Sequence, residues 1–187
     1  MSNKMTYNLS WGKNGIESST SVDYDISFRE KLYDYFSDVY KKLDLTYPKF
    51  YKMSNLAKLG FLATEILKKE QDLSIYNEDE IALVFQNSYS SLDTDEKHHE
   101  KVNEANAHPS PSIFVYTLPN IMLGEIAIRN QWFGENLFVL AEAFDIDDWK
   151  RTAESLIEMN KAKAVIGGWV DLYKDDFELK LYLLEKD

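Results

Sequence analysis

Three short runs of consecutive apolar residues constrain the fold of this chain most strongly. They are residues 81–85, 137–140 and 164–170. Each is typical of a strand that is buried in a sheet. Segments with apolar residues at helical spacing surround these runs, at residues 27–43, 54–69, 118–130 and 146–161. Strands that alternate with helices predict an α/β domain with a mostly parallel sheet and helices on both faces.

Local signals predict where the helices begin. Ser54 and Asp145 are expected N-caps, because a side-chain oxygen at this position accepts hydrogen bonds from free backbone N–H groups. Thr117 is expected to cap the helix at 118–130, with Pro119 in its first turn.

The remaining segments complete the predicted domain. The charged segment 95–106 is predicted to be helical, and alternating residues over 177–184 predict a final strand with one solvated face. Residues 1–25 are polar and are interpreted as a loose N-terminal arm with at most one short strand. Residues 26–187 are interpreted as a single domain, within which Gly167-Gly168 is expected to allow close packing of a strand against a helix.

Composition excludes several classes of function. The chain has no cysteine, so disulfides and thiolate chemistry are excluded. A net charge of −11 disfavours nucleic acid and anionic membranes as partners. The N-terminus has no apolar leader and no window has about 18 uninterrupted apolar residues, so a cytoplasmic protein without a membrane span is expected.

Two clusters of ionisable residues are candidate sites. His98 and His99 are adjacent, so on a helix they point about 100° apart and do not suit one metal ion. Between residues 41 and 69, seven lysines stand against Asp44 and Glu65, a local balance of +5. This segment is interpreted either as a solvated helix face or as a surface for an acidic partner. No metal or cofactor is expected.

Five segments, in order and at matching spacing, resemble one protein family. They are residues 51–60 (Tyr-Lys-Met-Ser-Asn-Leu-Ala-Lys-Leu-Gly), 85–92, 117–120 (Thr-Leu-Pro-Asn), 134–136 (Gly-Glu-Asn) and 165–168 (Val-Ile-Gly-Gly). The chain thus resembles the short β-ketoacyl synthase N-terminal-like domains of the thiolase-like superfamily. The resemblance implies half of a thiolase-like fold, with a mixed, mostly parallel five-stranded sheet.

The family's nucleophilic cysteine is missing. Counted from Gly134, its position is occupied by Ala143, whose methyl group cannot be acylated. The neighbouring Glu142 adds negative charge where a thioester carbonyl needs positive potential. The resemblance also implies that the family's catalytic histidines and lysine lie in a C-terminal half, to which nothing in residues 1–187 corresponds. A Glu142-dependent hydrolase is a distant alternative, because no nucleophile accompanies this carboxylate.

Two hypotheses of function follow from the resemblance. In the first, the chain is a non-catalytic accessory or chain-length-factor-like subunit in fatty acid, polyketide or polyene pigment biosynthesis. It would form a homo-oligomer or a heteromer with an active ketosynthase. The expected interface residues are Leu137, Phe138, Val139, Leu140, Asn120 and Ile121.

In the second hypothesis, the chain is an acyl-binding or acyl-carrier-protein-binding module without condensation activity. A pocket at the Ala143 turn would hold the acyl chain. Lys49, Lys52 and Lys58 would dock the acidic carrier.

Overall fold

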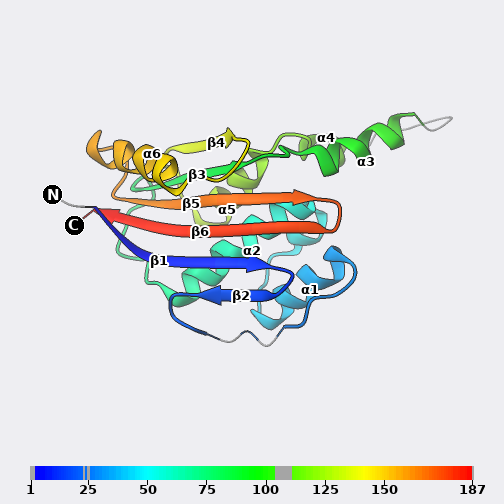
Figure 1. Ribbon diagram of the computed structural model, residues 1–187, viewed down its shortest axis with the longest axis horizontal. Coiled ribbons are helices and arrows are strands. Elements are labelled where there is room, and N and C mark those ends of the chain that lie inside the picture. Colours follow the sequence, from blue (N-terminus) through cyan, green and yellow to red (C-terminus); the bar gives the residue numbers. More distant parts are fainter. Residues whose placement is uncertain (1–2, 23, 25, 104–110, 187) are drawn as a thin grey trace.

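Six strands form one open mixed sheet in the computed structural model of the protein, which describes residues 3–22, 24, 26–103 and 111–186. The strands are β1 (Asn3–Gly12), β2 (Gly15–Ser18), β3 (Ile81–Asn87), β4 (Asn136–Leu140), β5 (Ala164–Tyr173) and β6 (Asp176–Lys186). Their order in the sheet is β2-β1-β6-β5-β3-β4 (Figure 1). β3 pairs in parallel with β4 and β5, whereas β6 is antiparallel to β1 and β5. The mixed α/β sheet is confirmed, with six strands rather than five. Three of the five pairings among the described strands are antiparallel, so the sheet is not mostly parallel as predicted.

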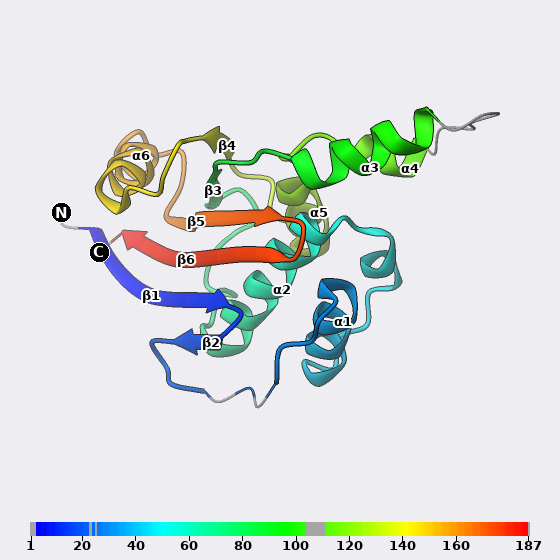
Figure 2. The same cartoon turned by 45° about the vertical axis from the view of Figure 1, so that its right-hand side comes forward.

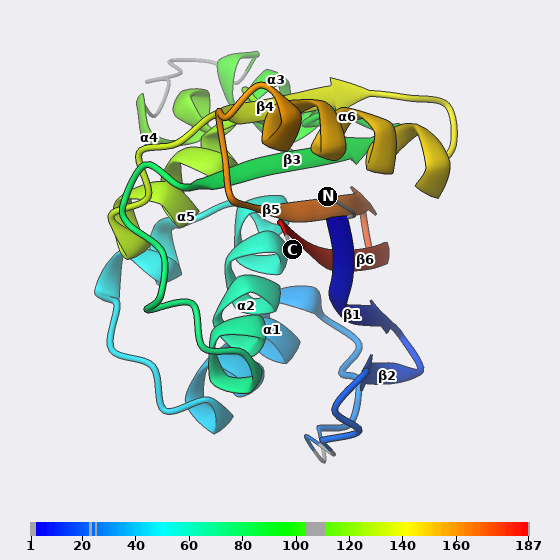
Figure 3. The same cartoon turned by 90° about the vertical axis from the view of Figure 1, so that its left-hand side faces the viewer.

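Helices cover both faces of this sheet. They are α1 (Leu32–Lys42), the 3-10 helix η1 (Pro48–Lys52), α2 (Asn55–Glu70), α3 (Leu92–Val102), α4 (Pro111–Val115), α5 (Ile121–Asn130) and α6 (Ile146–Glu158). α1, α2 and α5 lie on one face and α6 on the other (Figure 3). α3 and α4 extend past one end of the sheet (Figure 2).

The larger core lies between the sheet and α2. Leu59, Leu62 and Ile66 of α2 are fully buried, as expected for a helix that is apolar over a wide arc. The Ser54 side chain accepts a hydrogen bond from the Ala57 backbone N–H at 3.2 Å, so the predicted N-cap is confirmed.

The N-terminal segment differs from the predicted loose arm. β1 pairs with β6 along its length, and β2 adds a hairpin to it. Tyr7, Leu9 and Trp11 are 1–2% exposed and point into the core, while Asn8 and Ser10 between them are exposed. The polar residues made the segment look hydrophilic, although every second residue is aromatic or aliphatic.

Two helix boundaries also differ from the prediction. The Thr117 hydroxyl donates to the Phe114 carbonyl at 2.7 Å and so closes the turn after α4, while Asn120 occupies the N-cap position of α5. Thr117 is therefore not the N-cap. α3 begins at Leu92, earlier than expected, and residues 104–106 of the predicted helix lie outside the described residues.

Gly167 sits at the closest approach between β5 and β3. A Cβ atom there would lie 1.7 Å from the carbonyl oxygen of Val84. The same carbonyl accepts a hydrogen bond from Trp149 Nε1 of α6 at 2.8 Å. The glycine pair thus permits close packing between strands, whereas the sequence predicted packing of a strand against a helix. At the adjacent Gly168, a positive φ of 136° adds a second requirement for glycine.

Candidate functional site

The turn between β4 and α6 holds Ala143, the position that the sequence resemblance assigns to the family's nucleophile. Ala143 and Glu142 are both exposed on this turn. β4 lies at the edge of the sheet, and α6 begins at Ile146. The strand–turn–helix arrangement that the resemblance implied is present, and the residue expected at the nucleophile position carries a methyl group.

Carboxylates occupy the positive end of α6. Asp145 Oδ1 accepts hydrogen bonds from the backbone N–H groups of Asp147 at 2.9 Å and Asp148 at 3.2 Å. Asp145 is thus the N-cap, as predicted. These N–H groups and the helix dipole would favour a thiolate or an oxyanion, and here they already stabilise an internal carboxylate. The turn is therefore unsuited to acyl transfer.

β4 is the edge strand on one side of the sheet. It pairs with β3, and its outer edge has no strand partner within the described chain. Leu137 is 40% exposed and Leu140 is 59% exposed, while Phe138 and Val139 are half-buried. An exposed edge strand with large apolar side chains is a surface on which another strand can pair.

The other two expected interface residues lie at the start of α5, which packs beside β4. Asn120 is exposed and Ile121 packs partly against the larger core. Ile128 and Phe133, which the sequence interpretation did not single out, are 62% and 65% exposed. Scattered apolar residues are common on surfaces, but here they accompany an open strand edge.

The three candidate docking lysines lie in different environments. Lys52 is exposed, and Lys49 Nζ lies 2.9 Å from Glu125 Oε1 with its side chain 47% exposed. Lys58 is only 2% exposed, so it does not belong to a surface for a carrier protein. Its position on α2 predicted a solvated lysine, but Tyr33 of α1 and Phe50 of η1 cover it.

Glu125 is a buried ionisable residue that the sequence did not reveal. Its Oε1 accepts a hydrogen bond from Tyr116 Oη at 2.8 Å in addition to the ion pair with Lys49. Burial, followed by the interaction with Glu125, raises the pKa of Tyr116 above its usual value. This network connects α5 to η1. Lys49 therefore has a structural role as the partner of Glu125.

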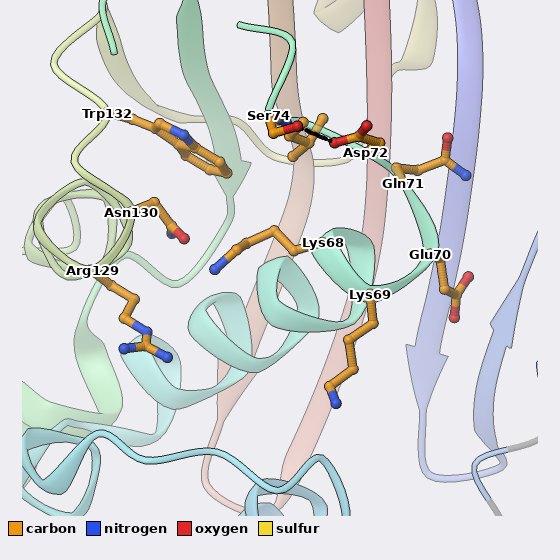
Figure 4. A pocket seen from close by; sticks show the side chains of 10 residues that line it. Lys68, Lys69, Glu70, Gln71, Asp72, Ser74, Arg129, Asn130 and Trp132 are labelled. Carbon is orange, nitrogen blue, oxygen red and sulfur yellow. Dashed lines mark hydrogen bonds between the residues drawn. The ribbon is translucent and has the colours of Figure 1, made fainter. Parts of the chain in front are cut away.

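A cavity of about 630 Å³ lies between the end of α2 and the end of α5 (Figure 4). Lys68 and Arg129 extend into the space between these helices, whereas Lys69 points away from it. Lys68 Nζ lies 2.9 Å from the buried Glu65 Oε1, and Arg129 Nε lies 3.6 Å from the same oxygen. Since both cations share an internal carboxylate, this cavity is better explained as a junction of two helices than as a ligand site.

The two adjacent histidines lie on α3 in separate environments. The His98 ring packs against the Phe114 ring at a centroid distance of 5.7 Å, while His99 Nε2 lies 2.9 Å from Asn103 Nδ2. No group of three or more His, Cys, Asp or Glu residues suited to a metal ion occurs within the described ranges. Among the same residues, no helix is long and apolar enough to cross a membrane.

No protein-family model and no curated protein matches the sequence. Solved structures do match the fold. A chain from the complex of a ketosynthase (ApeO) with its chain length factor (ApeC), from Xenorhabdus doucetiae, has a TM-score of 0.64 at 12% identity. The alignment covers 100% of the present chain and 80% of that chain.

Two further structures agree with this match. The ishigamide ketosynthase/chain length factor has a TM-score of 0.68 at 14% identity, over 100% of this chain and 62% of that chain. A chain of AntDE:AntF, a type II PKS acyl-carrier protein in complex with its ketosynthase bound to the hexaketide, has a TM-score of 0.70 at 10% identity. There, 98% of this chain and 62% of that chain are covered.

These matches define the class of fold. The present chain has the thiolase-like fold of ketosynthases and chain length factors, as the sequence resemblance implied. It spans 62% of the length of two of the matched chains. At such low identities the similarity concerns the fold, and function has to be argued from the residues of this chain.

Proposed function

We propose that this protein is a non-catalytic, chain-length-factor-like subunit that pairs with an active ketosynthase in the cytoplasm. The pathway would be the synthesis of a polyketide, a polyene pigment or a fatty acid. The observation that supports the proposal is the exposed Ala143 on a ketosynthase-like fold, at the position that the sequence resemblance assigns to the nucleophile. A chain that has this fold without the reactive group suits the role of a non-catalytic subunit that influences the reaction of an active ketosynthase.

The edge of β4 is the proposed contact surface. Leu137 and Leu140 expose apolar area, and the free backbone groups of the outer edge can accept a strand from a second protein. A second copy of this chain or a ketosynthase could supply that strand. Asn120 and Ile121 on the neighbouring α5 would lie at the border of this contact.

A reconstitution experiment tests the proposal. The chain is added to an active ketosynthase and its acyl carrier protein from the same source, and product lengths are measured by mass spectrometry. We expect the chain alone to form no acyl-enzyme, and the mixture to give a changed rate or product length. Condensation by the chain alone would contradict the proposal, as would products that are identical with and without it.

A second candidate function is the binding of an acyl carrier protein without condensation. Lys49 and Lys52 favour it, because both are accessible near the start of α2 and could meet an acidic carrier. The test is a titration of the isolated chain with an acyl carrier protein. Submillimolar affinity that is lost in K49E/K52E, but kept in a K150E/K161E control, would favour this function. Binding to a ketosynthase without binding to the carrier would favour the first proposal.

A further inference from the structure

A second cavity, of about 390 Å³, lies where α2 begins. Residues of α1, α3 and the segment around α4 complete its walls. Its size falls in the range of pockets that hold small molecules. The charged residues of its described lining are four lysines and one carboxylate: Lys52, Lys58, Lys97, Lys101 and Asp93. The cavity is thus positively charged, although the whole chain carries a net charge of −11.

Lys58 is the central cation of this cavity. The residue is 2% exposed, and its Nζ lies 4.2 Å from the centre of the Tyr33 ring and 5.6 Å from that of Phe50. No carboxylate within the described part of the chain forms a salt bridge with it. Burial, and secondarily the neighbouring Lys97, lower the pKa of Lys58 to about 8. A buried cation that lines a cavity and whose charge is opposed by its surroundings is a candidate for a functional site.

The single carboxylate in the lining does not neutralise Lys58. Asp93 Oδ2 lies 2.6 Å from Lys97 Nζ, four residues along α3, so Asp93 forms its salt bridge with Lys97. The Tyr33 ring provides a cation–π contact, but an aromatic face supplies no counter-charge. A bound anion would therefore supply the charge that Lys58 lacks.

The start of α2 adds to the preference for an anion. Ser54 and Asn55, the N-cap and the first residue of this 16-residue helix, line the cavity together with Lys58. The helix dipole places positive partial charge at this end. Lys58, Lys52 and the start of α2 thus all favour an anionic ligand.

We propose that this cavity binds a small phosphate monoester whose organic group lies against Tyr33, Met53 and Tyr116. A doubly charged phosphate suits a lining with an excess of three positive charges better than a carboxylate does, and lysine binds phosphate as a compact point charge. The aromatic walls provide apolar contact for the organic group. The inference does not depend on pairing with a ketosynthase, because the cavity lies within this chain.

Calorimetry with the full chain at pH 8 tests the site, with phenyl phosphate, benzoate and benzyl alcohol as probes. We expect submillimolar binding of phenyl phosphate, at least tenfold weaker binding of benzoate and no measurable binding of the alcohol. Phosphate binding should be accompanied by proton uptake, seen as a dependence of the heat on the buffer, because the anion raises the pKa of Lys58. K58M should weaken phenyl phosphate binding at least tenfold, whereas K69M, which removes an exposed lysine of the same helix, should not change it.

Three results would overturn the proposal: no binding of phenyl phosphate, equal binding of benzoate, or unchanged binding by K58M. If K58M does not fold, proton uptake by the wild-type chain decides. Binding without proton uptake would place the anion away from Lys58.

Discussion

The double substitution L137D/L140D separates the stability of the chain from its assembly. Both leucines lie on the edge strand β4, at 40% and 59% exposed, and their exposed parts together amount to about one whole leucine side chain. A partner strand would cover these parts. The substitution should therefore weaken association much more than folding.

The structure sets the expected size of both effects. Burying one whole leucine contributes about 1.5–3 kcal/mol, so losing it at an interface should weaken binding by roughly 10- to 150-fold. Covering two aspartates without partners would weaken it further. In the free chain each substitution affects a partly exposed position, so the unfolding free energy should fall by only about 1 kcal/mol or less.

Light scattering after size exclusion, alone and with a ketosynthase, measures association, and urea unfolding measures stability. The control V22D changes a side chain that is 44% exposed and follows β2, the strand at the opposite edge of the sheet, and it should leave association unchanged. Unchanged association of L137D/L140D would refute the role of β4. A loss of several kcal/mol in stability would refute the view that this edge contributes little to the fold.

Three further predictions concern the rest of the chain. A143C should not restore acylation. Its thiol should react with iodoacetamide no faster than a free cysteine, because the residues near the turn are carboxylates rather than cations. Rapid acylation of A143C would contradict this prediction. Because the Lys58 pKa is about 8 in the folded chain and about 10.4 in a model peptide, the unfolded state binds more protons between these values. The unfolding free energy of the wild type, measured with urea and taken relative to K58M, should therefore rise between pH 8 and 9.5 by up to about 1.4 kcal/mol per pH unit. A difference that does not change with pH would contradict the lowered pKa. G167A should lower the unfolding free energy by more than about 4 kcal/mol or prevent folding, because its Cβ would overlap the Val84 carbonyl. The control G124A, in open space on α5, should be neutral or stabilising. Equal melting temperatures of the two variants would contradict the packing argument.

The sequence predicted those elements whose signals are local. The buried runs of β3 and β5 and the N-caps Ser54 and Asp145 were identified correctly, because apolar periodicity and capping depend on neighbouring residues. β1 was missed because its apolar residues alternate with polar ones and find their partners on β6 and α1, distant in sequence.

The candidate sites show the same division. Ala143 follows from counting along a motif, and the structure places it on an exposed turn. The burial of Lys58 could not be predicted, because Tyr33 and Phe50 reach it only through the packing of α1 and η1 against α2. The junction of Lys49 with Glu125 likewise depends on the approach of η1 to α5.

Native mass spectrometry of the chain mixed with an active ketosynthase from the same source tests the central claim most directly. The account predicts a discrete complex at micromolar concentration that carries acyl groups on the ketosynthase and none on this chain. Two separate proteins at that concentration, or an acyl group attached to this chain during turnover, would contradict it.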